Sequence, residues 1–129
     1  MITAVHTLIY SDDPDATRAF LRDVLGWAWV SSSDAEPEWL IFKTGPSELG
    51  IHPTGGTSHD GRAYQMPRKH EITLMCDDLA ATMATLAARG ATFAGEPMAQ
   101  GFGLTVLLRV PGADDILLYE PRHRLAHML

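Results

Sequence analysis

Two stretches of the chain, His6-Thr-Leu-Ile-Tyr-Ser-Asp-Asp13 and Glu71-Ile-Thr-Leu-Met-Cys-Asp-Asp78, share one pattern at a spacing of 65 residues. Each runs from apolar, β-branched and aromatic residues into a pair of aspartates, which is typical of a strand followed by the start of a helix. The same shift places Leu21 on Leu86, inside the helix that each aspartate pair would begin. An internal match of this kind predicts a duplicated structural unit.

Outward from these stretches, each half is predicted to hold one strand, one helix and three further strands. The aspartates can accept backbone N–H groups of the first helical turn, and Pro14 suits that turn. Gly26 and Gly90, one residue out of step in the repeat, stand where the helices would end. We expect strands at residues 2–10, 27–31, 39–43 and 48–52, and again at 70–76, 91–94, 102–110 and 115–119.

The predicted elements divide a single domain into four segments: a first module at about 1–53, a linker at about 54–68, a second module at about 69–121 and a tail at 122–129. The linker is rich in Gly, Ser, His and Pro and is long for a loop in a compact domain. It contains Ser58-His59-Asp60, but neighbours in sequence cannot adopt the geometry of a catalytic triad, so we interpret it as a loop. The basic tail is interpreted as a solvated segment.

Composition excludes several classes of protein. The chain has 129 residues, 46% of them hydrophobic, and a net charge of -6 without a basic patch, so we expect no nucleic-acid partner. No apolar run approaches the roughly 20 residues that span a bilayer, so we expect no membrane partner. We expect no signal peptide, because the first residues lack a basic start followed by a long apolar run. The lone Cys76 cannot form an intramolecular disulfide and is interpreted as a small packed hydrophobe, which suits a reducing, cytoplasmic location.

Several further segments fit one known family when they are taken in order. They are Val5-His6-Thr7-Leu8, Val24-Leu25-Gly26-Trp27, Leu49-Gly50-Ile51-His52-Pro53, Pro111-Gly112 and Leu118-Tyr119-Glu120-Pro121. With the repeat, they resemble the vicinal oxygen chelate superfamily of glyoxalases, bleomycin resistance proteins and extradiol dioxygenases. The resemblance implies an α+β fold in which two βαβββ modules form open sheets around a central cavity. It also implies a homodimer, with the modules paired within one chain or across two.

The resemblance further implies metal ligands on the first and last strands of each half. Those positions fall on His6, His52 and Glu71, while the fourth is Leu117, so the usual last-strand carboxylate is missing. Because side chains alternate along a strand, Leu117 and Tyr119 share one face and Glu120 lies on the other. His70 and Glu120 would be the ligands only if the register slipped by one residue.

Two imidazoles and one carboxylate suit Fe, Mn, Zn, Ni or Co, and three protein ligands would leave positions open for a substrate. A structural interpretation stands beside this one. A lone strand histidine is commonly a packed or surface residue, and Arg68 and Lys69 indicate that the strand of Glu71 begins at the surface. A buried carboxylate without a partner would cost several kcal/mol, as an order of magnitude.

Two functions follow from these residues, and the catalytic residues stay unassigned. The first is a metal-dependent enzyme, a lyase, isomerase or dioxygenase acting on a small oxygen-rich or hydrophobic substrate. The alternative is a metal-free protein that binds and sequesters a small molecule, as bleomycin resistance proteins do, and a purely structural module is a third possibility. We expect the pocket wall to include Trp39, Phe102, Leu117 and Tyr119.

Overall fold

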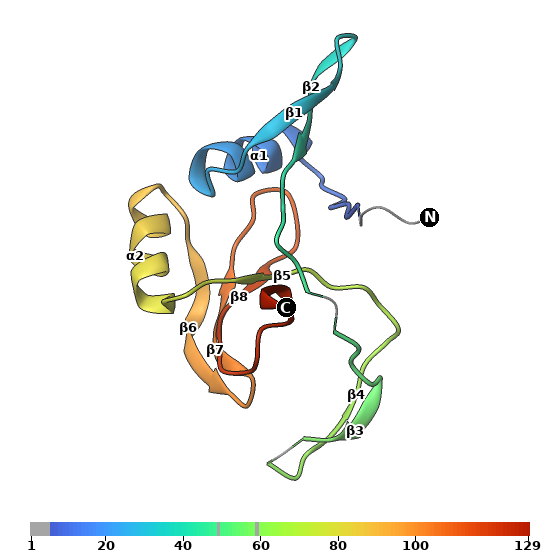
Figure 1. Cartoon of the computed structure of the whole chain (residues 1–129), viewed down its shortest axis with the longest axis vertical. Coiled ribbons are helices and arrows are strands. Elements are labelled where there is room, and N and C mark those ends of the chain that lie inside the picture. Colours follow the sequence, from blue (N-terminus) through green and yellow to red (C-terminus); the bar gives the residue numbers. More distant parts are fainter. Residues whose placement is uncertain (1–5, 49, 59) are drawn as a thin grey trace.

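The computed structural model describes residues 6–48, 50–58 and 60–129. The first half contains α1 (Pro14–Ala19), continued by the π-helical η1 (Phe20–Val24), and the strands β1 (Trp29–Ser33) and β2 (Glu36–Phe42). The strands β3 (Gly55–Thr57) and β4 (Ala63–Gln65) follow in the predicted linker. The second half contains β5 (Thr73–Met75), α2 (Leu79–Ala88), β6 (Phe93–Gln100), β7 (Gly103–Leu108) and β8 (Ile116–Pro121), followed by the 3-10 turn η2 (Ala126–Met128). Figure 1 shows β1–β2 and β3–β4 as arms that project away from the sheet of the second half.

Both helices begin as their aspartates predict. The Asp13 Oδ1 accepts the Ala16 N–H at 3.1 Å, and the Asp78 Oδ1 accepts the Ala81 N–H at 2.9 Å. Each contact satisfies a backbone donor that has no partner within the helix. The glycines that follow the two helices both have positive φ, so the predicted helix ends are confirmed as well.

The second half forms a complete βαβββ unit. Its sheet has the order β5-β8-β7-β6, in which β5 is parallel to β8 and the other two pairs are antiparallel. The sheet is open, with β5 and β6 at its edges. This architecture confirms the predicted α+β fold with open sheets.

The outer edge strand β6 is irregular. Its pairing with β7 shifts between Ala94 and Met98, where Gly95 has a φ of +77° and Pro97 has no N–H to donate. The regular ladder is therefore interrupted near the middle of this strand.

The core lies between this sheet and the helices of both halves. Apolar side chains of β7 and β8 pack against α2, and Phe20 and Leu21 of η1 join the same cluster. Leu108 of β7 has no exposed surface. Removal of these side chains from water stabilises the fold, by roughly 1.5–3 kcal/mol for each large residue.

A polar junction fixes the start of the first helix to the turn before β8. The Thr17 side chain is 5% exposed, and its hydroxyl donates to the Pro111 carbonyl. The Ser11 hydroxyl and the Asp12 N–H both donate to the Gly112 carbonyl, at 2.9 and 2.8 Å. The buried Thr17 hydroxyl favours one geometry of this junction, because it loses its partner if the turn moves.

The first half does not close a comparable sheet. Among residues 6–48, 50–58 and 60–129, strands β1 and β2 pair only with each other, and residues 6–10 and 50–52 are in no strand. The strands predicted over these described residues are therefore wrong for the single chain, because an extended segment needs a neighbour to share its hydrogen bonds. The predicted linker instead holds the β3–β4 hairpin, in which Ser58 N–H donates to the Arg62 carbonyl. Within the described part of the chain, no helix is long and apolar enough to cross a membrane.

Candidate functional site

The face of the second-half sheet that points away from α2 is the candidate site, and we call it the inner face. Strand register fixes its members, because Ile116, Leu118, Val106 and Leu108 are in the core and their neighbours must point the other way. The inner face comprises Thr73 and Met75 of β5, Thr105 and Leu107 of β7, and Leu117 and Tyr119 of β8. The common face predicted for Leu117 and Tyr119 is confirmed by this register.

Tyr119 is the centre of the aromatic part of this face. The Phe102 ring meets it edge to face, with the ring centroids 5.4 Å apart and the planes at 78°. Edge-to-face pairs contribute about 0.5–1.5 kcal/mol beyond the area that they bury. Two of the predicted pocket residues thus touch, and Leu117 lies on the same strand face as Tyr119, two residues before it.

The Tyr119 hydroxyl lies 3.1 Å from His123 Nε2. The other ring nitrogen of His123 lies 2.7 Å from the Arg124 carbonyl, which can only accept a hydrogen bond. In the neutral imidazole, a proton on Nδ1 satisfies that carbonyl and leaves Nε2 to accept from the tyrosine. Burial, and secondly the charge of Glu48, raises the pKa of Tyr119, so the phenol stays neutral at physiological pH.

Trp39, the fourth predicted pocket residue, lies elsewhere. It is on β2, 49% exposed, and its ring lies 5.0 Å from the guanidinium carbon of Arg18 on the first helix. This cation–π contact ties the β1–β2 hairpin to α1. Over the part of one chain that the structure describes, no ring contact joins Trp39 to the aromatic pair on the inner face.

The three predicted metal ligands are all exposed. His52 Nδ1 lies 2.7 Å from the Pro53 carbonyl, and its ring packs 5.7 Å from that of Tyr64. Glu71 forms an ion pair with Lys69. Over residues 6–48, 50–58 and 60–129, no group of three or more His, Cys, Asp or Glu side chains could hold a metal ion. One chain therefore does not bring His6, His52 and Glu71 together, and the donor set does not fit a metal within a single copy.

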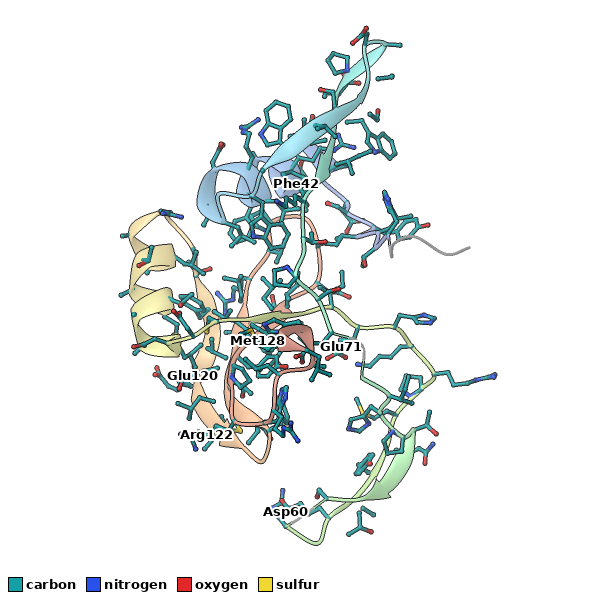
Figure 2. The ribbon with its side chains drawn as sticks, viewed as in Figure 1. Phe42, Asp60, Glu71, Glu120, Arg122 and Met128 are labelled. Atoms are coloured by element: carbon teal, nitrogen blue, oxygen red, sulfur yellow. The ribbon has the colours of Figure 1, made fainter. Side chains whose placement is uncertain are left out.

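The two register-slip alternatives have other surroundings. The Glu120 carboxylate accepts the Leu79 N–H at 2.9 Å, at the start of α2 and thus on the outer side of the sheet. A negative charge there satisfies a free helix donor and stabilises the helix dipole. His70 is exposed before β5 begins. Figure 2 shows Glu71 and Glu120 well apart, on either side of Met128.

A further pair near the site had no signal in the sequence. Glu48 Oε1 accepts the backbone N–H of His127 at 3.1 Å and lies 3.0 Å from its Nδ1, and both side chains are mostly buried. Hydrogen bonding from the His127 backbone is the main cause that lowers the pKa of Glu48. The two residues are 79 positions apart, so no local pattern could have joined them.

The β1–β2 hairpin carries a separate apolar surface. A hollow of about 300 Å³ is lined there by Ala28, Trp29, Val30, Ile41, Phe42 and Lys43. Val30 is 63% and Trp29 46% exposed. A two-stranded hairpin is marginally stable in water without a packing partner, so burial of this face against another surface would stabilise the hairpin.

Comparison with known proteins places these features in a family. The family description "Glyoxalase/Bleomycin resistance protein/Dioxygenase superfamily" matches residues 3–118. A search among curated proteins finds no match.

Solved structures share the fold at low sequence identity. An antibiotic binding protein, TnmS3 from Streptomyces sp. CB03234, is 17% identical with a TM-score of 0.61, over 93% of this chain and 97% of its own. A lactoylglutathione lyase from Agrobacterium tumefaciens is 19% identical with a TM-score of 0.58, over 92% and 94%. The fosfomycin resistance protein FosX from Listeria monocytogenes is 19% identical with a TM-score of 0.53, over 100% and 98%.

Proposed function

Because the chain belongs to the glyoxalase/bleomycin resistance protein/dioxygenase superfamily, we propose that it is a metal-free binding protein that sequesters a small aromatic or apolar molecule. The ligand would lie against the inner face of the second-half sheet. The observation that carries this proposal is Leu117, an apolar side chain two residues from Tyr119 on the same strand face, at the position where the resemblance puts a metal-ligating carboxylate. A hydrocarbon side chain cannot coordinate a metal, but it can pack against a ring.

The chemistry of the inner face suits a planar ligand with a polar edge. Leu107 and Leu117 offer hydrocarbon surface, and the Phe102 and Tyr119 rings offer aromatic edges and faces. The neutral phenol of Tyr119 supplies one hydroxyl that can exchange its His123 partner for a ligand oxygen. The antibiotic binding protein among the fold relatives is consistent with this class of ligand.

Thermal-shift screening against planar aromatic compounds tests the proposal. A ligand at one hundred times its dissociation constant stabilises the native state by about 2.7 kcal/mol, which is a shift of several degrees for a domain of this size. Leu117→Glu should abolish that shift by placing a charge in the apolar surface, whereas Glu96→Ala, on exposed β6, should leave it unchanged. Silence across a broad library, together with clear stabilisation by a divalent metal, would reject metal-free binding.

We also propose that two copies of the chain pair through the β1–β2 hairpin. The exposed Trp29, Val30 and Ile41 and the apolar hollow beside them support this proposal, since the described part of the chain leaves that face uncovered. Sedimentation velocity should give a dimer for the native sequence and a monomer for Val30→Asp. A native monomer at micromolar concentration would contradict the pairing.

A metal-dependent enzyme of the lyase, isomerase or dioxygenase type is the second candidate, and one contact favours it. Since His52 Nδ1 faces the Pro53 carbonyl, Nε2 is the nitrogen left for another partner, and metal-binding histidines commonly use this arrangement. Bound between two copies by His6, His52 and Glu71, a divalent metal would supply Lewis-acid chemistry. Elemental analysis of protein purified without chelator should then find about one equivalent per site, lost in His52→Ala. Less than a tenth of an equivalent after reloading would reject it.

A further inference from the structure

The C-terminal residues 122–129, which we call the strap, fold back over the inner face, although the basic residues Arg122, His123 and Arg124 stay exposed as predicted. The strap begins where the Arg122 N–H donates to the Phe102 carbonyl at 2.8 Å. Its next residue, His123, contacts the Tyr119 hydroxyl at 3.1 Å, and the two rings are 6.0 Å apart. The strap therefore occupies the surface next to both aromatic residues of the proposed ligand site.

The far end of the strap is held by the first half of the chain. Glu48, in the connection after β2, receives both the backbone N–H and the ring nitrogen of His127. Beyond that point the strap is poorly packed, because Met128 is 74% and Leu129 101% exposed. Figure 2 shows Met128 in front of the sheet and Arg122 near its lower end. Polar contacts, and little apolar burial, hold this segment in place.

Exposure to solvent differs along the inner face. Thr105 and Tyr119, which are register partners, are 3% and 8% exposed. Leu107, two residues further along the same face, is 40% exposed. Phe102, which contacts the Tyr119 ring, is itself 43% exposed. Within the strap, His123 contacts both the hydroxyl and the ring of Tyr119, so the strap contributes to the closed part of the face beside this residue.

We propose that the strap is a built-in, displaceable occupant of the inner face, and that a ligand stacking on Tyr119 must first release it. His123 and the ligand compete for one phenol and one aromatic surface, and Glu48 with His127 sets how readily the strap leaves. This inference rests on the proposed ligand face, but not on the metal or on the identity of the natural ligand.

The full-length Glu48→Ala variant tests the proposal, because it removes both contacts to His127 at once. Hydrogen–deuterium exchange of peptides covering the strap should accelerate by about tenfold, the scale expected for losing charge-assisted hydrogen bonds. In a fluorescence titration, the dye 8-anilinonaphthalene-1-sulfonate should bind the variant at least about threefold more tightly, since less of the protein is in the closed state. Glu96→Ala makes the same chemical change on exposed β6 and should alter neither measurement.

Two results would overturn the proposal. If the strap exchanges faster but the dye binds equally or less tightly, the strap is a fixed wall of the site. If exchange is unchanged in both Glu48→Ala and His123→Ala, these contacts do not hold it. Should Glu48→Ala lose its cooperative unfolding transition, His127→Ala replaces it, because that variant keeps the Glu48 contact to the backbone. If the dye binds more tightly but no compound in the thermal-shift screen stabilises the protein, the proposed ligand class is rejected and the proposal that the strap is displaceable is retained.

Discussion

The two halves of the chain start alike and finish differently. Both begin a helix at the second of two aspartates, but only the second half closes a four-stranded sheet. There, β5 pairs in parallel with β8, with Thr73 opposite Leu117 and Met75 opposite Tyr119. The 65-residue shift puts the equivalent pairing at residues 8–10 and 52–54, and the single chain does not form it. The helix caps depend on near neighbours and therefore recur in both halves. The parallel pairing of the first and last strands depends on residues far apart in the sequence, and it forms in the second half.

Core substitutions should give the largest difference between the halves in the free energy of unfolding. Leu108→Ala, in β7, should destabilise the protein by about 2–5 kcal/mol, because a fully buried side chain leaves a cavity. Leu8→Ala, in the unpaired segment of the first half and 58% exposed, should stay within about 0.5 kcal/mol. Urea denaturation at low protein concentration measures both. Equal losses would mean that the first half holds a covered sheet of its own in solution.

The junction between the halves is the next test. Gly112→Ala should cost about 2 kcal/mol or more, because its φ is +78° and a Cβ would lie 2.6 Å from the Ser11 hydroxyl and 2.9 Å from Asp13 backbone atoms. Gly61→Ala has a similar φ of +82° but open space, so only the conformational cost of about 1 kcal/mol should remain. The difference between their free energies of unfolding isolates the steric contact. Equal losses in the two variants would show that the junction rearranges around the new methyl group at no cost in free energy.

The aspartate caps compare the halves directly. Asp13→Ala and Asp78→Ala should each lower the free energy of unfolding by about 1 kcal/mol, because each exposes an unpaired helix donor. Substitution by Asn, which also caps, should restore most of that loss in each case. A cost confined to Asp78→Ala would indicate that the first helix contributes nothing to cooperative unfolding.

The smallest effect should come from the contact between the first half and the strap. Since the pKa of Glu48 is lower in the folded protein than its ordinary value of 4.5, its contribution to stability is present above that value. The contribution is lost as pH falls through the lowered folded-state pKa. Between pH 6 and pH 3, the free energy of unfolding of the native sequence should therefore fall more steeply than that of the Glu48→Gln variant. Parallel curves for the two proteins would contradict this role for Glu48.

Residue patterns alone predicted the parts that depend on near neighbours. Capping by Asp13 and Asp78 follows from side chains within three residues of their partners, and alternation alone put Leu117 and Tyr119 on one face. The family implied by the quoted motifs was confirmed over most of the chain. The metal set His6, His52 and Glu71 stays a prediction.

The features that the sequence could not predict depend on contacts between residues far apart in the chain. Glu48 and His127 are polar residues in irregular segments, and nothing in either segment indicates the other. The β3–β4 hairpin arose where composition suggested a linker, because Gly and Ser are compatible with a tight turn as well as with a flexible chain. Whether residues 6–10 form a strand depends on a neighbour that the single chain does not bring to them.

The irregular β6 strand has a consequence for how this sheet meets other chains. An exposed edge of a sheet is a template on which a foreign strand can add and start aggregation. The break at Gly95 and Pro97 removes a regular row of donors and acceptors from one edge, and β5 limits the other edge to three residues. The open sheet therefore offers few regular edge positions at which fibril-like growth could start.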